Sequence, residues 1–237
     1  RDLHSFPTRR SSDLAIQTLT LQDGTPYKET AALPVGELTY KRNFKNTYWQ
    51  PLYIPFRMSY EDWSDQFEVA RWLNMHTIDT DDDGKADQWE MEFIRVKEGT
   101  LLENHPYLIR AKEEGEKTIT LNNTTIYPAE TNSIECASTE YAYEFKGAYE
   151  KTDFPTDSDD RFLVMGKGKF GKGTYINPYR VYLRISDKDG QLVTINEAKI
   201  IVVDEFGVEE TTSINSLESD KNEITAVYSA NGIKQTS

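Results

Sequence analysis

The sequence contains very little cysteine: Cys136 is the only one in 237 residues. One cysteine excludes a disulfide within the chain and a zinc site built from several thiolates. We interpret Cys136, in the segment SIECAS, as a small, half-buried hydrophobic side chain. The lack of disulfides does not exclude export, because many exported bacterial domains of this size are stable without them.

Basic residues are also scarce, and long apolar runs are absent. The chain has 27 Lys and Arg against 40 Asp and Glu, which gives a formal net charge of −13. Such a surface repels nucleic acid and anionic membranes, and it suits solubility or cation binding. No apolar run approaches the roughly 20 residues that a membrane helix requires. We therefore expect neither a nucleic-acid partner nor a membrane-spanning segment.

The first 14 residues, RDLHSFPTRRSSDL, match no part of an export signal. They lack the apolar run of such a signal, and their three arginines are too sparse for a nucleic-acid-binding arm. Written as codons, the stretch resembles a common short-read sequencing adapter across all its positions. We predict that residues 1–14 are translated adapter and that the protein proper begins near Ala15, at the broken end of an assembled fragment. Without them the net charge is about −14, from 24 basic and 38 acidic residues.

Aromatic residues, by contrast, are abundant: 14 Tyr, 10 Phe and 4 Trp, which favour strands over helices. Polar and apolar residues alternate in many short segments, among them AIQTLTL (15–21), WEMEFIRV (89–96) and YRVYLRIS (179–186). Strands recur every 8–12 residues or so, with turn residues between them. This pattern predicts an all-β fold, either an antiparallel β-sandwich or a partly open barrel.

One short helix is predicted near residues 59–66, where Ser59 precedes Asp62 with the spacing of a capping box. Residues 15–206 then form a β-rich module, either single or built from two packed sub-modules. Residues 207–221 are acidic, rich in Ser and Thr and without periodicity, so we predict a linker. Residues 222–237 contain a strand and an Asn231-Gly232 hairpin signal, and we interpret them as the start of a truncated β module.

The segment DTDDDGKADQWE (79–90) fits the calcium-loop pattern D-x-D-x-D-G-x5-E. Calcium prefers six to eight oxygen ligands, alternate carboxylates converge on one side of a tight loop, and Gly84 permits the sharp turn. Both flanks alternate as strands rather than helices, so we reject an EF-hand and predict a calcium-binding β-hairpin loop. A solvated acidic turn is the alternative. The predicted ligands are Asp79, Asp81, Asp83, Asp87 and Glu90, with Lys85 contributing its backbone carbonyl.

The segment FLVMGKGKFGKG contains the pattern G-x-G-x-x-G at Gly166, Gly168 and Gly171. A dinucleotide site needs a helix after this pattern, but a further strand follows here. We therefore predict a flexible Gly/Lys hairpin loop. Outside the adapter, the two histidines, His76 and His105, belong to no pair with metal-ligand spacing, so structural roles are expected for both.

Tryptophan and tyrosine side chains suggest a second binding hypothesis. The candidates for a platform on which sugar rings stack are four tryptophans, chiefly Trp49, Trp63 and Trp72 and also Trp89, together with Tyr48, Tyr53 and Tyr60. At strand spacing, however, most such residues pack in the core or across strands. Exposed, coplanar rings would favour the platform.

Three long segments resemble a known bacterial module. These are NTYWQPLYIPFRMSYEDWSDQFEVAR, ENHPYLIRAKEEGEKTITLNN and INPYRVYLRI. They resemble a β-rich module near the C-terminus of large surface and secreted proteins of gut and oral Bacteroidota, which often carry leucine-rich or immunoglobulin-like repeats. The resemblance covers about residues 20–206, and AVYSANGIKQTS resembles the short module that closes such chains. It implies export, a β-sandwich and a non-catalytic role, and it supplies no catalytic residues.

We therefore expect a metagenomic fragment of an extracellular or cell-surface protein whose signal peptide was lost with the N-terminus. Its function would be that of an accessory module, not an enzyme, which spaces, displays or anchors neighbouring domains of the same chain, with calcium stiffening one hairpin. Contact with a glycan or a host surface is a further expectation. The first alternative is a carbohydrate-binding module. The second is a hydrolase acting on glycans or peptides, which would need convergent polar groups in a pocket.

Overall fold

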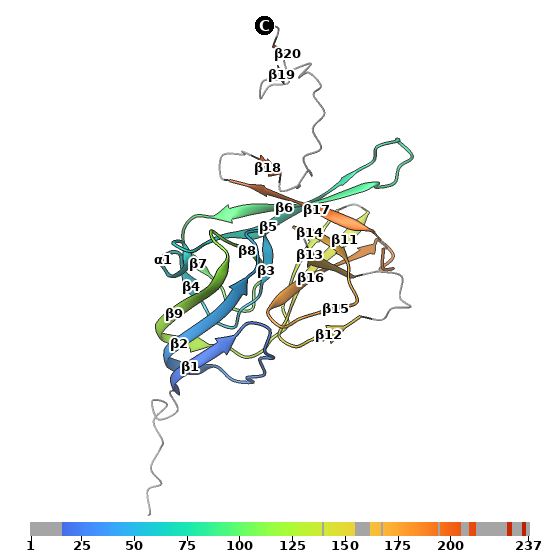
Figure 1. Cartoon of the computed structure of the whole chain (residues 1–237). Coiled ribbons are helices and arrows are strands. Elements are labelled where there is room, and N and C mark those ends of the chain that lie inside the picture. Colours follow the sequence, from blue (N-terminus) through green and yellow to red (C-terminus); the bar gives the residue numbers. More distant parts are fainter. Residues whose placement is uncertain are drawn as a thin grey trace, which may run out of the picture.

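The computed structural model describes residues 16–138, 140–154, 162–166, 168–193, 195–204, 209–211, 227–228 and 234–235. The fold is all-β, as the alternation predicts, and most described residues lie in strands (Figure 1). The predicted adapter at residues 1–14 lies outside the described residues. The same holds for most of the predicted linker and of the predicted C-terminal module.

A large sheet forms most of the molecule. Its strands are, in spatial order, β10 (Ser133–Ala137), β11 (Tyr141–Ala148), β16 (Arg180–Asp187), β13 (Phe162–Gly166), β14 (Lys169–Lys172), β17 (Glu197–Val203), β6 (Gln88–Val96), β5 (Phe67–Ile78), β8 (Tyr107–Ala111) and β3 (Gln50–Leu52). Within the predicted linker, β18 (Glu209–Thr211) pairs with β17.

A second sheet contains β1 (Ile16–Gln22), β2 (Leu33–Phe44) and β9 (Gly115–Ile126). Three further ladders pair β4 (Met58–Ser59) with β7 (Thr100–Leu101), β12 (Thr152–Asp153) with β15 (Tyr175–Ile176), and β19 (Val227–Tyr228) with β20 (Lys234–Gln235). Nearly all pairs are antiparallel, but β1 with β2 and β17 with β6 are parallel. The fold is therefore mixed in detail, although its class is the predicted one.

The large sheet curls until strands far apart in its order face each other. Phe145 on β11 packs edge-on against Trp72 on β5, with ring centroids 5.6 Å apart, and against Phe93 on β6 at 5.8 Å. A flat sheet would keep these strands on one plane and out of contact. The result is the predicted sandwich-like or partly open barrel, with one continuous core that runs from Leu21 to Val202.

The predicted helix is present and very short. α1 (Tyr60–Trp63) begins after Ser59, whose backbone N–H donates to Asp62 Oδ2 at 2.6 Å. The Ser59 hydroxyl donates to the same oxygen at 2.7 Å. This Ser59–Asp62 pair confirms that the 59–66 segment begins a helix where the sequence predicts one.

Buried tyrosines line the junction between the two sheets. Tyr149 packs against Tyr27, Tyr53 and Tyr179, with ring centroids 4.7–5.8 Å apart. The hydroxyls of Tyr27, Tyr53 and Tyr149 donate to oxygen atoms of the protein; that of Tyr53 donates to the Glu130 carbonyl at 2.6 Å. Burial raises the pKa of Tyr53 to about 12. The four rings therefore fill space between the sheets, and the hydroxyls of Tyr27, Tyr53 and Tyr149 are hydrogen-bonded within the protein.

Candidate functional site

The acidic hairpin, residues 79–87, joins β5 to β6 and extends away from the body of the molecule (Figure 1). Strands flank it on both sides, which confirms that it is not an EF-hand. Carboxylate oxygens of Asp79, Asp81 and Asp87 lie within 4.8 Å of one another, and all three side chains are exposed. The fold thus brings three of the five predicted carboxylates together.

Hydrogen bonds inside the acidic hairpin use several of the same oxygens. Asp79 Oδ2 accepts the backbone N–H of Gly84 at 2.8 Å, and Asp87 Oδ2 accepts the backbone N–H of Thr80 at 2.9 Å. The Thr80 hydroxyl also donates to Asp87, and this hydrogen bond lowers the pKa of that carboxyl. Gly84 has a φ of 82°, which fits the sharp turn that the sequence predicts. These bonds account for the acidic turn without an ion.

The other predicted ligands lie outside this group of three. Asp83 Oδ1 accepts the backbone N–H of Lys85 at 2.8 Å. Glu90 lies on β6, with its Oε1 3.8 Å from the ammonium of Lys199. The full predicted ligand set is therefore not gathered at one point, and calcium binding stays a prediction from the sequence pattern.

The predicted sugar platform is wrong at its tryptophans. Trp49 and Trp63 are each 2% exposed, Trp72 is 6% exposed and Trp89 is 5% exposed, and Tyr53 is buried as well; of the predicted tyrosines, Tyr48 is exposed. Trp49 lies under the guanidinium of Arg110, 4.9 Å from the ring centroid, while Trp72 packs on Phe145. A sugar ring needs an open aromatic face, and the core covers these faces. Trp72 lies on the inward face of β5, Trp63 ends α1 and Trp49 directly precedes β3, and composition alone did not reveal that all three point into the core.

The glycine pattern forms a hairpin, as predicted. Gly166 ends β13, Gly168 lies in the turn with a φ of 79°, and Gly171 lies within β14. The two strands pair antiparallel from Leu163–Lys172 to Gly166–Lys169. No helix follows, so this segment lacks the geometry of a dinucleotide site.

A cleft of about 710 Å³ lies beside this hairpin. One wall is the hairpin with the segment that follows it, and the opposite wall is the segment that joins β2 to β3. Its lining includes apolar side chains, among them Trp49 and Met165, several carboxamides, and the side chains of Asp23, Lys45, Tyr48, Lys172, Tyr175 and Arg180. The glycine pattern marks one wall of this cleft, but no pattern in the sequence indicates the cleft itself.

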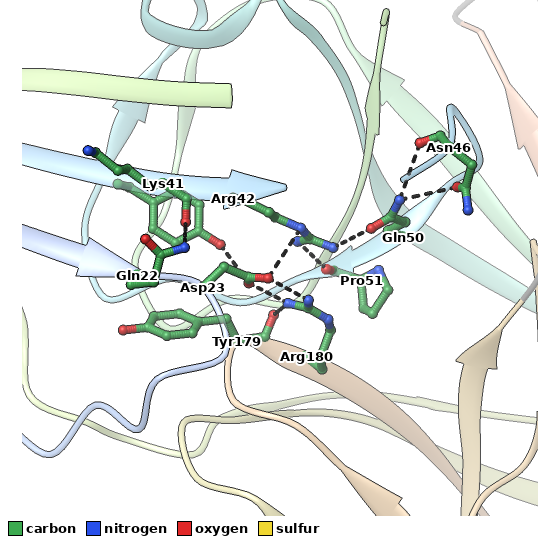
Figure 2. Close-up of polar contacts among 10 residues, drawn as sticks. Gln22, Asp23, Lys41, Arg42, Asn46, Gln50, Pro51, Tyr179 and Arg180 are labelled. Carbon is green, nitrogen blue, oxygen red and sulfur yellow. Dashed lines mark hydrogen bonds and ion pairs between the residues drawn. The ribbon is translucent and has the colours of Figure 1, made fainter. Parts of the chain in front are cut away.

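At the wall of the cleft is a set of charged side chains that we call the buried arginine cluster: Asp23 and Arg180, which line the cleft, and Arg42, which lies behind them (Figure 2). Arg180 forms a bidentate ion pair with Asp23: its Nη1 donates to Oδ1 at 2.6 Å and its Nη2 donates to Oδ2 at 2.7 Å. Arg42 is 1% exposed, and its Nε lies 3.8 Å from Asp23 Oδ2. Residues 157 positions apart in the chain thereby meet in one ion pair.

Arg42 reaches this place because of strand alternation. In β2 the inward-facing row is Leu38, Tyr40, Arg42 and Phe44, so the arginine occupies a core position. Its guanidinium donates to the carbonyl of Pro51 at 2.9 Å and to Oε1 of Gln50 at 2.8 Å. The alternation in GELTYKRNF was the signal that places a charge among apolar neighbours.

The electrostatics of the buried arginine cluster are unbalanced, because two guanidiniums share one carboxylate. Burial, followed by the nearby charge of Arg180, lowers the pKa of Arg42. Burial by itself would raise the pKa of Asp23, but the hydrogen bond from Arg180 and the two positive charges outweigh it and leave that pKa lowered. With all three groups ionised, the cluster carries a net charge of +1 at the edge of the cleft.

The histidines and the cysteine have separate structural partners. His76 Nε2 lies 2.7 Å from Glu92 on the neighbouring strand, and His105 stacks on Tyr107 with ring centroids 4.5 Å apart. Cys136 Sγ lies 3.6 Å from Asn74 Oδ1. None of the three lines the cleft.

A comparison with known protein families, curated proteins and solved structures found no match to this chain. Among the described residues, no helix is long and apolar enough to cross a membrane. Any functional statement about this chain therefore rests on its own sequence and geometry.

Proposed function

We propose that this chain is a non-catalytic accessory module of an exported, cell-surface protein, which holds neighbouring domains of the same chain at a fixed spacing. A spacer has to resist deformation, so its elements need to be joined by strong contacts between distant parts of the chain. The observation that carries the proposal is the bidentate Asp23–Arg180 ion pair, which ties the turn after β1 to the first residue of β16.

Other features support the same function. One core cluster includes residues of the sheet β1–β2–β9 and of the large sheet as far along the chain as Val202 on β17. The two sheets therefore share one apolar core. The resemblance of residues 20–206 to a module of Bacteroidota surface proteins agrees with display outside the cell. The excess of acidic residues agrees with a soluble, displayed domain.

The experiment that tests this proposal is long-read sequencing of the gene from its source DNA. We expect the true reading frame to replace residues 1–14 with an export signal and further domains. A reading frame that leads into a catalytic domain would make this module part of an enzyme. A complete gene that encodes this module alone, without an export signal, would contradict the proposal.

A further inference from the structure

The cleft beside the glycine hairpin differs in charge from the rest of the molecule. Its lining contains Lys45 and Arg180 beside one carboxylate, Asp23; a third cation in the lining, Lys172, has an interaction of its own and is not counted toward the excess. Arg42 lies directly behind the wall, since it contacts Asp23, Gln50 and Pro51 (Figure 2). In a chain with a net charge of −13, this local excess of positive charge selects anions.

The positive charge cannot be balanced by the buried carboxylate alone. Asp23 is engaged by both nitrogens of Arg180, so its charge is already shared with Arg42 at 3.8 Å. Lys45 is exposed, and its ammonium has no ion pair among the described residues. An anion in the cleft would gain attraction from Lys45 and from the excess charge of the buried arginine cluster.

Aromatic rings at the same cleft point to more than a small inorganic ion. Tyr48 is 40% exposed and Tyr175 is 48% exposed, and both line the cleft; the ammonium of Lys151 lies 4.9 Å from the centroid of the Tyr175 ring, so Tyr48 offers the more open face. They are two of the five large hydrophobic side chains that the described surface exposes. An aromatic ring half open to solvent beside a polar cleft is the usual stacking surface for the apolar face of a sugar ring.

The remaining lining suits a ligand with many hydroxyl groups. Asn43, Asn46, Gln50 and Asn177 bring carboxamides, which both donate and accept hydrogen bonds. A volume of about 710 Å³ holds a saccharide of a few rings and far exceeds what one phosphate or sulfate ion fills. We propose that this cleft binds an acidic saccharide, with the sugar carboxylate near Lys45 and a ring on Tyr48 or Tyr175. This binding goes beyond the spacer function and does not depend on it.

The proposal is tested by titrating the full 237-residue chain, labelled with ¹⁵N, with trigalacturonate and following amide shifts by NMR. The matched neutral probe is the same trisaccharide with all three carboxyls methyl-esterified, which keeps the rings and removes the charge. We expect shifts around Tyr48, Gly168 and Tyr175 with the acid, and binding of the ester about tenfold weaker or worse, which corresponds to 1.4 kcal/mol. Equal binding of acid and ester, or shifts elsewhere alone, would overturn the proposal.

Two surface variants and one control locate the site. Lys45→Gln removes the exposed charge, and Tyr48→Ala removes an exposed ring. Each variant is expected to bind trigalacturonate about tenfold more weakly than the wild type, with an unchanged melting temperature. Lys112→Gln removes an exposed lysine that does not line the cleft, and its affinity should equal that of the wild type. Unchanged affinity in both cleft variants would refute the assignment.

Two further probes distinguish the saccharide from other anions. Sodium sulfate at equal ionic strength is expected to compete weakly and to leave the amides around Tyr48 unshifted. Adenosine 5′-monophosphate also combines charge with a stacking ring, and we expect it to bind more weakly than trigalacturonate. Tighter binding of either probe than of the saccharide would contradict the assignment. The spacer proposal would remain intact, because it rests on the Asp23–Arg180 link and on the complete gene.

Discussion

The acidic hairpin and the buried arginine cluster both gather charged side chains, but they do so in opposite surroundings. In the hairpin, four aspartates of one short segment are exposed and accept hydrogen bonds from the backbone of their own loop. In the cluster, three single residues from distant segments meet inside the protein. A charge has its largest effect on stability where water is excluded. The buried arginine cluster is therefore expected to contribute more to the free energy of unfolding than the acidic hairpin.

The largest expected effect follows from Asp23→Asn. This change removes the carboxylate and leaves the buried guanidinium of Arg42 and the half-buried guanidinium of Arg180 without a counter-charge, so we expect the free energy of unfolding to fall by about 3 kcal/mol. Urea unfolding measures this difference. A loss below about 1 kcal/mol would mean that solvent screens the buried arginine cluster, and the comparison with the acidic hairpin would fail.

Arg42→Met should cost less, although the arginine is the most buried of the three. The change leaves Asp23 and Arg180 as a neutral pair, while the Pro51 carbonyl and the Gln50 side chain lose a donor. We expect a loss of about 1–3 kcal/mol, which is the cost of one or two unsatisfied polar groups. Unfolding in urea, run beside Asp23→Asn, decides the order. Arg42→Met as the more damaging change would refute the charge balance described for this cluster.

The pH dependence of stability distinguishes the two regions next. The pKa of Asp23 in the folded chain is lowered from its model-peptide value near 3.8. Its contribution is therefore present above about pH 4 and is lost as the pH falls through the folded pKa, at about 1.4 kcal/mol for each unit of lowering. Asp23→Asn should flatten this part of an acid titration followed by tryptophan fluorescence. If the acid unfolding curve of Asp23→Asn equals that of the wild type, carboxylates other than Asp23 cause the loss of stability at low pH.

The smallest expected effects belong to the acidic hairpin. If calcium binds with the affinity of extracellular sites, about 0.1–1 mM, millimolar calcium stabilises the chain by about 1 kcal/mol. Thermal melts in calcium and in chelator measure this difference. Asp81→Asn is the matched control: it should abolish the calcium effect and change stability by no more than about 0.5 kcal/mol without calcium. Melts that coincide in calcium and chelator would remove the calcium prediction.

The fold class was accessible from the sequence because alternation reports which strands bury one face. Segments such as WEMEFIRV lie in the predicted strands, and the Ser59–Asp62 pair begins the predicted helix. Which strands pair with each other could not be predicted from the sequence. The parallel pairs β1–β2 and β17–β6 join strands by tertiary contact, and no local pattern encodes that pairing.

The candidate sites divide in the same way. The acidic hairpin is visible in the sequence since its residues are contiguous. The tryptophan platform was wrong because the number of aromatic residues does not tell which of them point into the core, whether they lie in a strand, as Trp72 does, or in the helix, as Trp63 does. The inward position of Arg42 was encoded in the alternation of β2, whereas its partners Asp23 and Arg180 are brought to it only by folding.

Native-state hydrogen exchange tests the central claim most directly, since it reports whether the two sheets open together. In the wild type, amides of β2 and β16 are expected to exchange with the same free energy of opening. In Asp23→Asn, amides near the turn after β1 and at the start of β16 should exchange with a lower one. A wild-type β2 that opens independently of β16, or an Asp23→Asn pattern identical to the wild type, would contradict a module held rigid by its buried arginine cluster.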